Sequence, residues 1–290
     1  MKAIKNLIIS LVVIVAILGV VIIGGYIYVR TTYGIDLFRT AGQLKTLTQA
    51  VDETALCPNA YGEEDFAAMK TELNKKFDGF IIYEEGKGYN GYSVDLGSLA
   101  GKSLSGKISL TEKQVGAITQ TVFYEQTGGK IKIAEKEVSV SVVQVDFSQI
   151  AENGSADFNV VAKLDLTPLK SNMNDFPYKY FKKYIPDSFY VSSTVRVDKT
   201  EANGFDYTIV HKSLTLNNLS ADDTADLFDT LNAVLKIGTA ESLNTQIGYM
   251  AVNALIGTKD NPGFAYSMKV AGVTTFNFVT ASPADYFIVN

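Results

Sequence analysis

The sequence has few of the residues that metal sites and many enzymes use. Its 290 residues include one cysteine, one histidine and no tryptophan. A single cysteine cannot form an internal disulfide, and a single histidine excludes sites built from histidine pairs. Basic residues are also in the minority, since 26 Lys and Arg stand against 31 Asp and Glu, a net charge of −5. We therefore expect no nucleic-acid partner, no metal and no other cofactor.

Catalytic motifs are missing as well. The segment Gly97–Ser103 resembles a phosphate-binding loop, but three residues separate its glycines where that loop needs four. No Gly-x-Ser-x-Gly elbow and no Ser-x-x-Lys dyad occurs. His211 stands at the end of an alternating strand pattern, and Cys57 precedes a proline in a connector. We interpret both as structural residues and predict no catalytic residue and no enzymatic activity.

Carboxylates keep one enzymatic alternative open, because a glycosidase needs only two of them. Four aspartates cluster in the first turns of a predicted helix: Asp222, Asp223, Asp226 and Asp229. Acidic side chains near a helix N-terminus are stabilised by the helix dipole, so we favour a solvated helix face. A carboxylate-dependent wall hydrolase stays a second alternative.

The N-terminus contains 24 consecutive uncharged residues, from Asn6 to Val29, dominated by Ile, Val and Leu. As a helix they would extend ~36 Å, enough to cross the ~30 Å hydrocarbon core of a bilayer. A cleaved signal peptide has a shorter apolar stretch and a small-x-small cleavage site, and the exit Gly24–Arg30 offers no such site. The run predicts an uncleaved transmembrane signal anchor.

Charges on either side of this run predict its orientation. Lys2 and Lys5 precede it, whereas Arg30 follows it directly, so the positive-inside bias favours a cytoplasmic N-terminus. The body is then extracytoplasmic, on a single-pass protein of the cell membrane. Without these three residues, 23 basic residues stand against 31 acidic ones, so the exported part carries a charge of −8.

The chain as a whole is expected to divide into three parts. Residues 1–30 form the cytoplasmic tip and anchor, residues 31–105 a helical neck with a Gly- and Tyr-rich subdomain, and residues 106–290 an antiparallel sheet domain with helices. Apolar residues at helical spacing predict the neck helices: Leu37, Leu44, Leu47 and Val51, then Phe66, Met69, Leu73 and Phe77. The alternative for the first of them is a stalk that continues the membrane helix. A turn at 85–88 separates two short strands.

The sheet domain begins with a strand at 108–110 and a capping box from Thr111 to Gln114, which starts a helix. Long alternating strands follow, with a change of phase at Val142–Val143 that indicates a bulge. Helices are expected after Ser220 and up to Gly257, and the tail 264–289 is strand-like. A weaker strand at 214–216 before Ser220 leaves an internal duplication open. The class is α+β, with two or three helices against the sheet.

One segment combines aromatic and basic residues between two prolines, Pro177 and Pro186. On a short helix, Tyr178, Phe181 and Ile185 share one face, flanked by Tyr180 and Tyr184, with the lysines opposite. It is either a connector that caps the end of a sheet or a contact with the membrane interface or a lipid headgroup. The candidate contact residues are Tyr178, Lys179, Phe181, Lys182, Lys183 and Tyr184.

The anchor, the strand-to-helix entry at 108–114, the long meander and the segment 176–186 together resemble the YpmS-like membrane-anchored envelope proteins of Gram-positive bacteria. More loosely, they resemble tubular lipid-binding folds, in which a curved antiparallel sheet wraps a helix around an apolar groove. The resemblance covers the anchor and about residues 105–215. It implies a lipid-associated envelope role and no catalytic residue.

We therefore expect a membrane-anchored, extracytoplasmic, non-enzymatic protein that binds lipid or another apolar ligand. Its expected partners are membrane lipid and other envelope proteins. The first alternative is a scaffold or interaction subunit of a cell-envelope complex. Ligand binding predicts an apolar cavity between sheet and helix, a scaffold predicts a filled core and an exposed apolar patch, and an enzyme predicts two facing carboxylates in a cleft.

Overall fold

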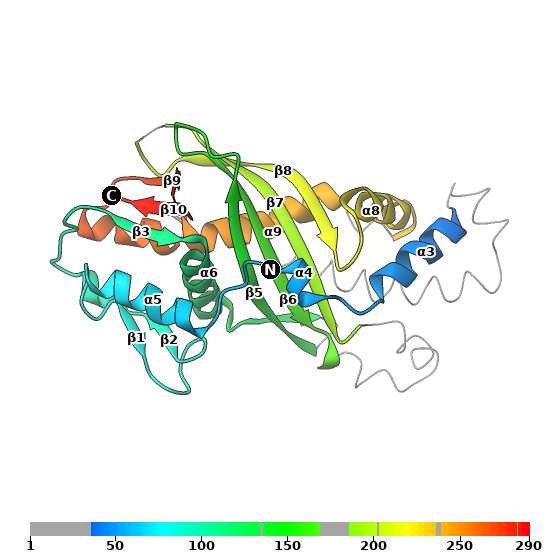
Figure 1. Ribbon diagram of the computed structural model, residues 1–290, viewed down its shortest axis with the longest axis horizontal. Helices are drawn as coiled ribbons and strands as arrows, with labels where there is room; N and C mark the ends of the chain where they lie inside the picture. Colours follow the sequence, from blue (N-terminus) through cyan, green and yellow to red (C-terminus); the bar gives the residue numbers. More distant parts are fainter. Residues whose placement is uncertain (1–35, 134–135, 169–185, 202, 236–238, 283) are drawn as a thin grey trace.

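The computed structural model describes residues 36–133, 136–168, 186–201, 203–235, 239–282 and 284–290 (Figure 1). They form antiparallel sheets and helices, which confirms the α+β class. Among these residues, no helix combines the length and the apolar character that a membrane span requires. The predicted anchor Asn6–Val29 lies outside the described residues and stays a prediction.

The neck contains the expected helices and hairpin. Its elements are α3 (Leu37–Leu47), α4 (Glu53–Leu56), α5 (Glu63–Asn74), β1 (Ile81–Tyr83), β2 (Tyr92–Val94) and the short 3-10 helix η1 (Leu96–Leu99). Phe66, Met69 and Leu73 are the buried side chains of α5, as their spacing predicts. The two strands pair antiparallel around the turn at 85–88. Local pattern was sufficient here because each element is defined by neighbours in sequence.

The alternative of a stalk is wrong for α3, the part of this segment that the structure describes as a helix. Thr40, Gln43 and Leu47 are buried, and α3 packs against α8 (Ala221–Leu235). Arg39 forms ion pairs with Asp223, at 3.8 Å, and with Asp226. The first helix after the predicted anchor is therefore part of the folded body, because it buries polar and apolar side chains against another helix.

One short and four long strands form the main sheet in the order β4-β5-β6-β7-β8, with every pair antiparallel. Their bounds are β4 (Lys130–Ile133), β5 (Lys136–Ser148), β6 (Ala156–Asp165), β7 (Ser188–Lys199) and β8 (Tyr207–Leu216). The register between β5 and β6 shifts between Val142 and Gln144, which confirms the predicted bulge. Since β4 pairs only with residues 136–139, the rest of β5 is an edge of the sheet.

Two expectations about β8 are wrong. Residues 214–216 are the end of this one strand rather than a separate strand, and His211 lies inside it rather than at its end. Val195 pairs with His211 and Thr194 with Ser213, so Lys212 is an extra bulge residue. The bulge moves the inward-facing positions from Tyr207 and Ile209 to Leu214 and Leu216. This change of phase looked like the end of a strand.

A smaller sheet has the order β3-β10-β9, with β3 (Ile108–Thr111), β9 (Phe276–Ala281) and β10 (Ala284–Val289). The expectation of a strand-like tail is wrong for its first part, which forms α10 (Phe264–Ser267) and the 3-10 helix η4 (Met268–Ala271). Phe264, Met268 and Ala271 are buried. They are three or four residues apart, which is the spacing of a helix face.

Two helices fill the concave side of the main sheet: α6 (Glu112–Thr127) and α9 (Ala240–Leu255). The capping box of α6 is confirmed, since Gln114 N donates to Thr111 Oγ1 at 3.4 Å and Thr111 N to Gln114 Oε1 at 3.0 Å. Asp223 N donates to Ser220 Oγ at 3.1 Å, as expected of an N-cap. Gly257 follows α9 with a φ of 79°, the conformation expected of a glycine at a helix end.

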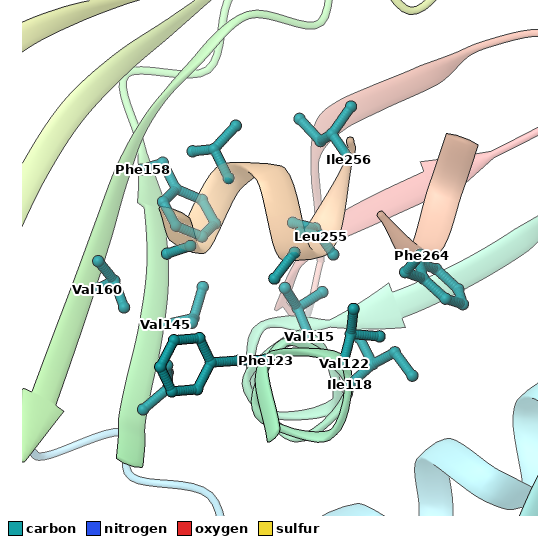
Figure 2. Close-up of a cluster of buried hydrophobic side chains, with 14 of the residues drawn as sticks. Val115, Ile118, Val122, Phe123, Val145, Phe158, Val160, Leu255, Ile256 and Phe264 are labelled. Carbon is teal, nitrogen blue, oxygen red and sulfur yellow. The ribbon is translucent and has the colours of Figure 1, made fainter. Parts of the chain in front are cut away.

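Buried side chains occupy the space between the sheet and these helices. Figure 2 shows Val115, Val122 and Phe123 of α6 between Val145, Phe158 and Val160 of the sheet and Leu255 at the end of α9. The same hydrophobic cluster extends from Leu47 to Val289, on both sides of the expected domain boundary at residue 105. The boundary itself stays a prediction.

Candidate functional site

The predicted contact residues Tyr178 to Tyr184 lie outside the described residues, but both ends of their segment are defined. Leu166 N donates to Asp187 O at 2.8 Å, directly beyond the paired residues Asp165 and Ser188. The connection therefore leaves the sheet where β6 ends and β7 begins.

The C-terminal end of α3 is fixed at the same end of the sheet. Asn217, which is buried with a φ of 48°, accepts a hydrogen bond from Tyr190 N at 2.7 Å through Oδ1. Its Nδ2 donates to Leu47 O at 2.8 Å. Tyr190 is two residues from the start of β7. We name this region the anchored end; it consists of α3, Asn217 and the residues flanking 169–185. Helix α3 lies at its margin in Figure 1.

From this end, residues 51–61 cross the convex face of the sheet. Val51, Leu56 and Cys57 pack with Val143 of β5, Val161 of β6 and Tyr190 of β7, in a cluster separate from the main core. Asn59 N then donates to Gln144 Oε1 at 3.0 Å. The Tyr61 hydroxyl donates to Val142 O at the bulge. The chain thus covers part of the sheet before α5 begins.

A cleft of about 400 Å³ opens where this segment meets the bulge of β5. That volume is within the range of small-molecule sites. Its lining comes from four places in the sequence: the segment Glu53–Phe66, the turn residues Tyr89 and Asn90, the bulge residues Val142 and Val143, and Lys163 and Tyr190 of the sheet.

The lining of the cleft includes an ion pair. Lys163 Nζ lies 2.9 Å from Glu53 Oε1 and 5.3 Å from the centroid of the Tyr190 ring. The Tyr190 hydroxyl is buried and forms no hydrogen bond of standard geometry with a described residue. It is nevertheless close enough, together with Lys163, to lower the pKa of Glu53. The acid of a glycosidase needs a raised pKa, so this carboxyl suits such a role poorly.

The aromatic side of the cleft is a row of rings. Tyr61 and Phe66 have centroids 5.4 Å apart, and those of Phe66 and Tyr89 are 5.8 Å apart. Burial raises the pKa of both tyrosines, so their hydroxyls are protonated at neutral pH. These rings form the aromatic part of the lining.

Two helices hold the bulges of the sheet with buried amides. On α6, Gln120 Oε1 accepts from Val142 N at 2.6 Å. On α9, Asn244 Nδ2 donates to Thr194 O at 2.8 Å and lies 2.7 Å from His211 Nδ1. Each helix has a glycine one turn from its amide: a Cβ on Gly116 would overlap the Tyr61 ring, and one on Gly248 would overlap Val195. Both helices thus approach a bulge closely.

The residues tested in the sequence for catalysis lie apart from one another. Burial raises the pKa of Cys57 to about 11, so the thiol is protonated at neutral pH and is a poor nucleophile. His211 contacts Asn244 on the other side of the sheet. Asp222 and Asp229 are exposed, as a solvated face predicts, whereas Asp223 and Asp226 contact Arg39.

The cleft residues were not found in the sequence. Glu53, Tyr61, Glu63, Lys163 and Tyr190 belong to no motif, and more than 100 positions separate Glu53 from Lys163. One signal did point to the place, because the phase change at Val142–Val143 marks the bulge beside which the cleft opens.

No protein-family model matches the chain, no curated protein matches it, and no solved structure matches it. The site is therefore interpreted from its own residues.

Proposed function

We propose that this chain is a membrane-anchored, extracytoplasmic, non-enzymatic protein that contacts lipid at its anchored end. One observation carries the proposal: α3, which starts eight residues after the uncharged run, docks at the end of the sheet from which the connection 166–187 leaves. An anchor in the bilayer would therefore bring Lys179, Lys182 and Lys183 to the membrane surface. The YpmS-like resemblance stays a prediction and agrees with this role.

The packing of the core narrows the mode of lipid contact. Buried side chains occupy the space between the sheet and helices α6 and α9, where a lipid carrier would need a groove. We therefore propose contact with lipid headgroups at the surface. Each lysine near an anionic membrane contributes about 1 kcal/mol, and the anchor makes even a weak contact effective by raising its local concentration.

The absence of tryptophan allows a direct test with the full-length protein in vesicles that contain anionic lipid. Phe181→Trp places a single fluorophore in the proposed contact, and Tyr83→Trp places one on the exposed β1–β2 hairpin, at the opposite end of the molecule (Figure 1). Brominated lipids should quench the tryptophan at 181 and leave the one at 83 unquenched. The triple change K179E/K182E/K183E should reduce the quenching at 181.

Equal quenching at the two positions, or none at 181, would overturn the proposed contact. The topology has its own test, because protease added to intact protoplasts should digest the body. Full protection of the body would place it in the cytoplasm instead.

An interaction subunit of an envelope complex is a second candidate, favoured by the apolar side chains at the end opposite α3. Ile82, Tyr83, Leu96 and Val270 are 40 to 72% exposed, and η1 contacts η4, so Leu96 and Val270 lie on neighbouring turns. Leu96→Asp with Val270→Asp should abolish crosslinking to a protein partner in intact cells while leaving the lipid quenching unchanged. Unchanged crosslinking would remove this candidate.

A further inference from the structure

The charged groups that line the cleft are not evenly balanced. Lys163 is neutralised by Glu53 at 2.9 Å. Glu63, the first residue of α5, also lines the cleft, is exposed, and forms no ion pair with any residue that the structure describes. The cleft therefore presents one uncompensated negative charge.

Aromatic rings accompany this carboxylate. Tyr61, Phe66 and Tyr89 line the cleft together with Glu63, and their centroids are spaced by 5.4 and 5.8 Å. The negative π faces of such rings attract organic cations, and an adjacent carboxylate strengthens that attraction. The cation of the chain itself, Lys163, lies on a different ring, that of Tyr190. The row from Tyr61 to Tyr89 contacts no ammonium group among the described residues.

A polar group completes the lining. The Tyr190 side chain is 3% exposed, and its hydroxyl forms no hydrogen bond of standard geometry with a described residue. A buried hydroxyl without such a bond is unfavourable unless water or a ligand supplies one. Glu53 and Lys163 are its neighbours in the lining, and a ligand group that comes between them can bond to it.

We propose that the cleft binds a small organic cation that also carries a hydrogen-bonding group, as an amino alcohol does. Its ammonium group lies against Glu63 and the rings of Tyr61 and Tyr89, and its hydroxyl or ester oxygen bonds to Tyr190. This site adjoins the anchored end through Tyr190, but it does not depend on the proposed lipid contact.

Saturation-transfer NMR of the full-length protein in detergent tests the proposal with choline as the probe. Its neutral isostere 3,3-dimethyl-1-butanol has the same shape and the same hydroxyl, so it separates a cation site from an apolar pocket. Choline should bind at least about tenfold more tightly than the isostere, because the Glu63 and ring contacts require the charge. Equal binding of the two probes, or no choline binding, would overturn the proposal.

Variants with matched controls assign the contacts. Glu63→Gln should weaken choline binding about tenfold, whereas Glu64→Gln, on the next residue and outside the lining, should change it less than about twofold. Tyr190→Phe should weaken choline about threefold and leave tetramethylammonium, which has no hydroxyl, unaffected. Equal effects of the two Glu variants would exclude the Glu63 contact and with it the site. Melting temperatures of all variants check that they are folded.

The same measurement separates two sources of the ligand. Glycerophosphocholine contains the headgroup of a lipid without its chains. Tighter binding of glycerophosphocholine than of choline would indicate a lipid headgroup, and tighter binding of choline would indicate a free amine.

Discussion

Helix α6 approaches the bulge at Val142–Val143 and helix α9 approaches the bulge at Lys212; we call these contacts the α6 junction and the α9 junction. Each combines a glycine with a buried amide one turn away, but the two helices contact different partners. At the junction of α6, Gly116 faces Tyr61, which belongs to the connection before α5, and Gln120 binds the backbone of an edge strand. At the junction of α9, Gly248 faces Val195, in the interior of the main sheet, and Asn244 binds the strand next to the edge. The first partner belongs to a connection outside the main sheet, whereas the second is held by strands on both sides.

The two side-chain amides also play opposite roles in their hydrogen bonds to the sheet backbone. Gln120 accepts from a peptide N–H, and Asn244 donates to a peptide carbonyl. A buried N–H can form only one good hydrogen bond, whereas a carbonyl oxygen has two lone pairs and can keep a second partner. Losing a hydrogen-bond partner therefore costs more free energy at an N–H than at a carbonyl. The comparison teaches that similar geometry does not imply similar sensitivity to mutation.

The largest expected effect is at the α9 junction. Gly248→Ala places a Cβ against Val195, which is fully buried and β-branched. Overpacking costs up to about 3 kcal/mol at a site as rigid as this one, and the gain in helix propensity offsets about 1 kcal/mol of it. We expect a net loss near 2 kcal/mol, seen as a melting temperature about 4–8 °C lower. Gly42→Ala in α3, where no atom lies near, is the control and should not destabilise.

The second effect is the loss of the N–H partner at the α6 junction. Gln120→Met keeps the length of the side chain and leaves Val142 N without its acceptor in a buried setting. We expect a loss of about 1–2 kcal/mol in the free energy of unfolding. Gln126→Met on the exposed part of the same helix is the control. A smaller loss for Gln120→Met than for Asn244→Leu would contradict the expected order.

The third effect is the loss of the donor at the α9 junction. Asn244→Leu removes the bonds to Thr194 O and His211. The expected loss is about 1 kcal/mol, because the Thr194 carbonyl tolerates the loss of a partner better than an N–H does. Both variants also remove a buried amide atom that has no hydrogen-bond partner among the described residues, Gln120 Nε2 in one and Asn244 Oδ1 in the other. Thermal unfolding of the full-length protein in detergent measures the loss for Asn244→Leu and for Gln120→Met under the same conditions.

The smallest effect is expected at the α6 glycine. Gly116→Ala displaces the Tyr61 ring, but this ring is partly exposed and belongs to a connection outside the main sheet. Gained helix propensity offsets most of the strain, so the change should stay within about 0.5 kcal/mol. A loss equal to that of Gly248→Ala would show that Tyr61 is as rigid as a central strand.

The bulges also illustrate what a sequence can predict. The bulge at Val142–Val143 was predicted because two long alternating runs of opposite phase adjoin it. The bulge at Lys212 produces the same signal, but only Leu214 and Leu216 follow it, and so short a run was interpreted as a new strand. The segment 264–271 forms only short helical turns and precedes true strands in the sequence, so its pattern is too short to distinguish it from them.

Local patterns in the sequence determined the class, the long strands, the capping box at Thr111–Gln114 and the helix faces, since periodicity and capping depend on residues within a few positions of each other. Tertiary structure alone decided where α3 docks, which amide meets which bulge, and that a cleft forms. Those features join Asn217 to Leu47, 170 positions away, and Lys163 to Glu53, 110 positions away. No local pattern encodes such pairs, because they are brought together only when the helices and the connection settle on the finished sheet.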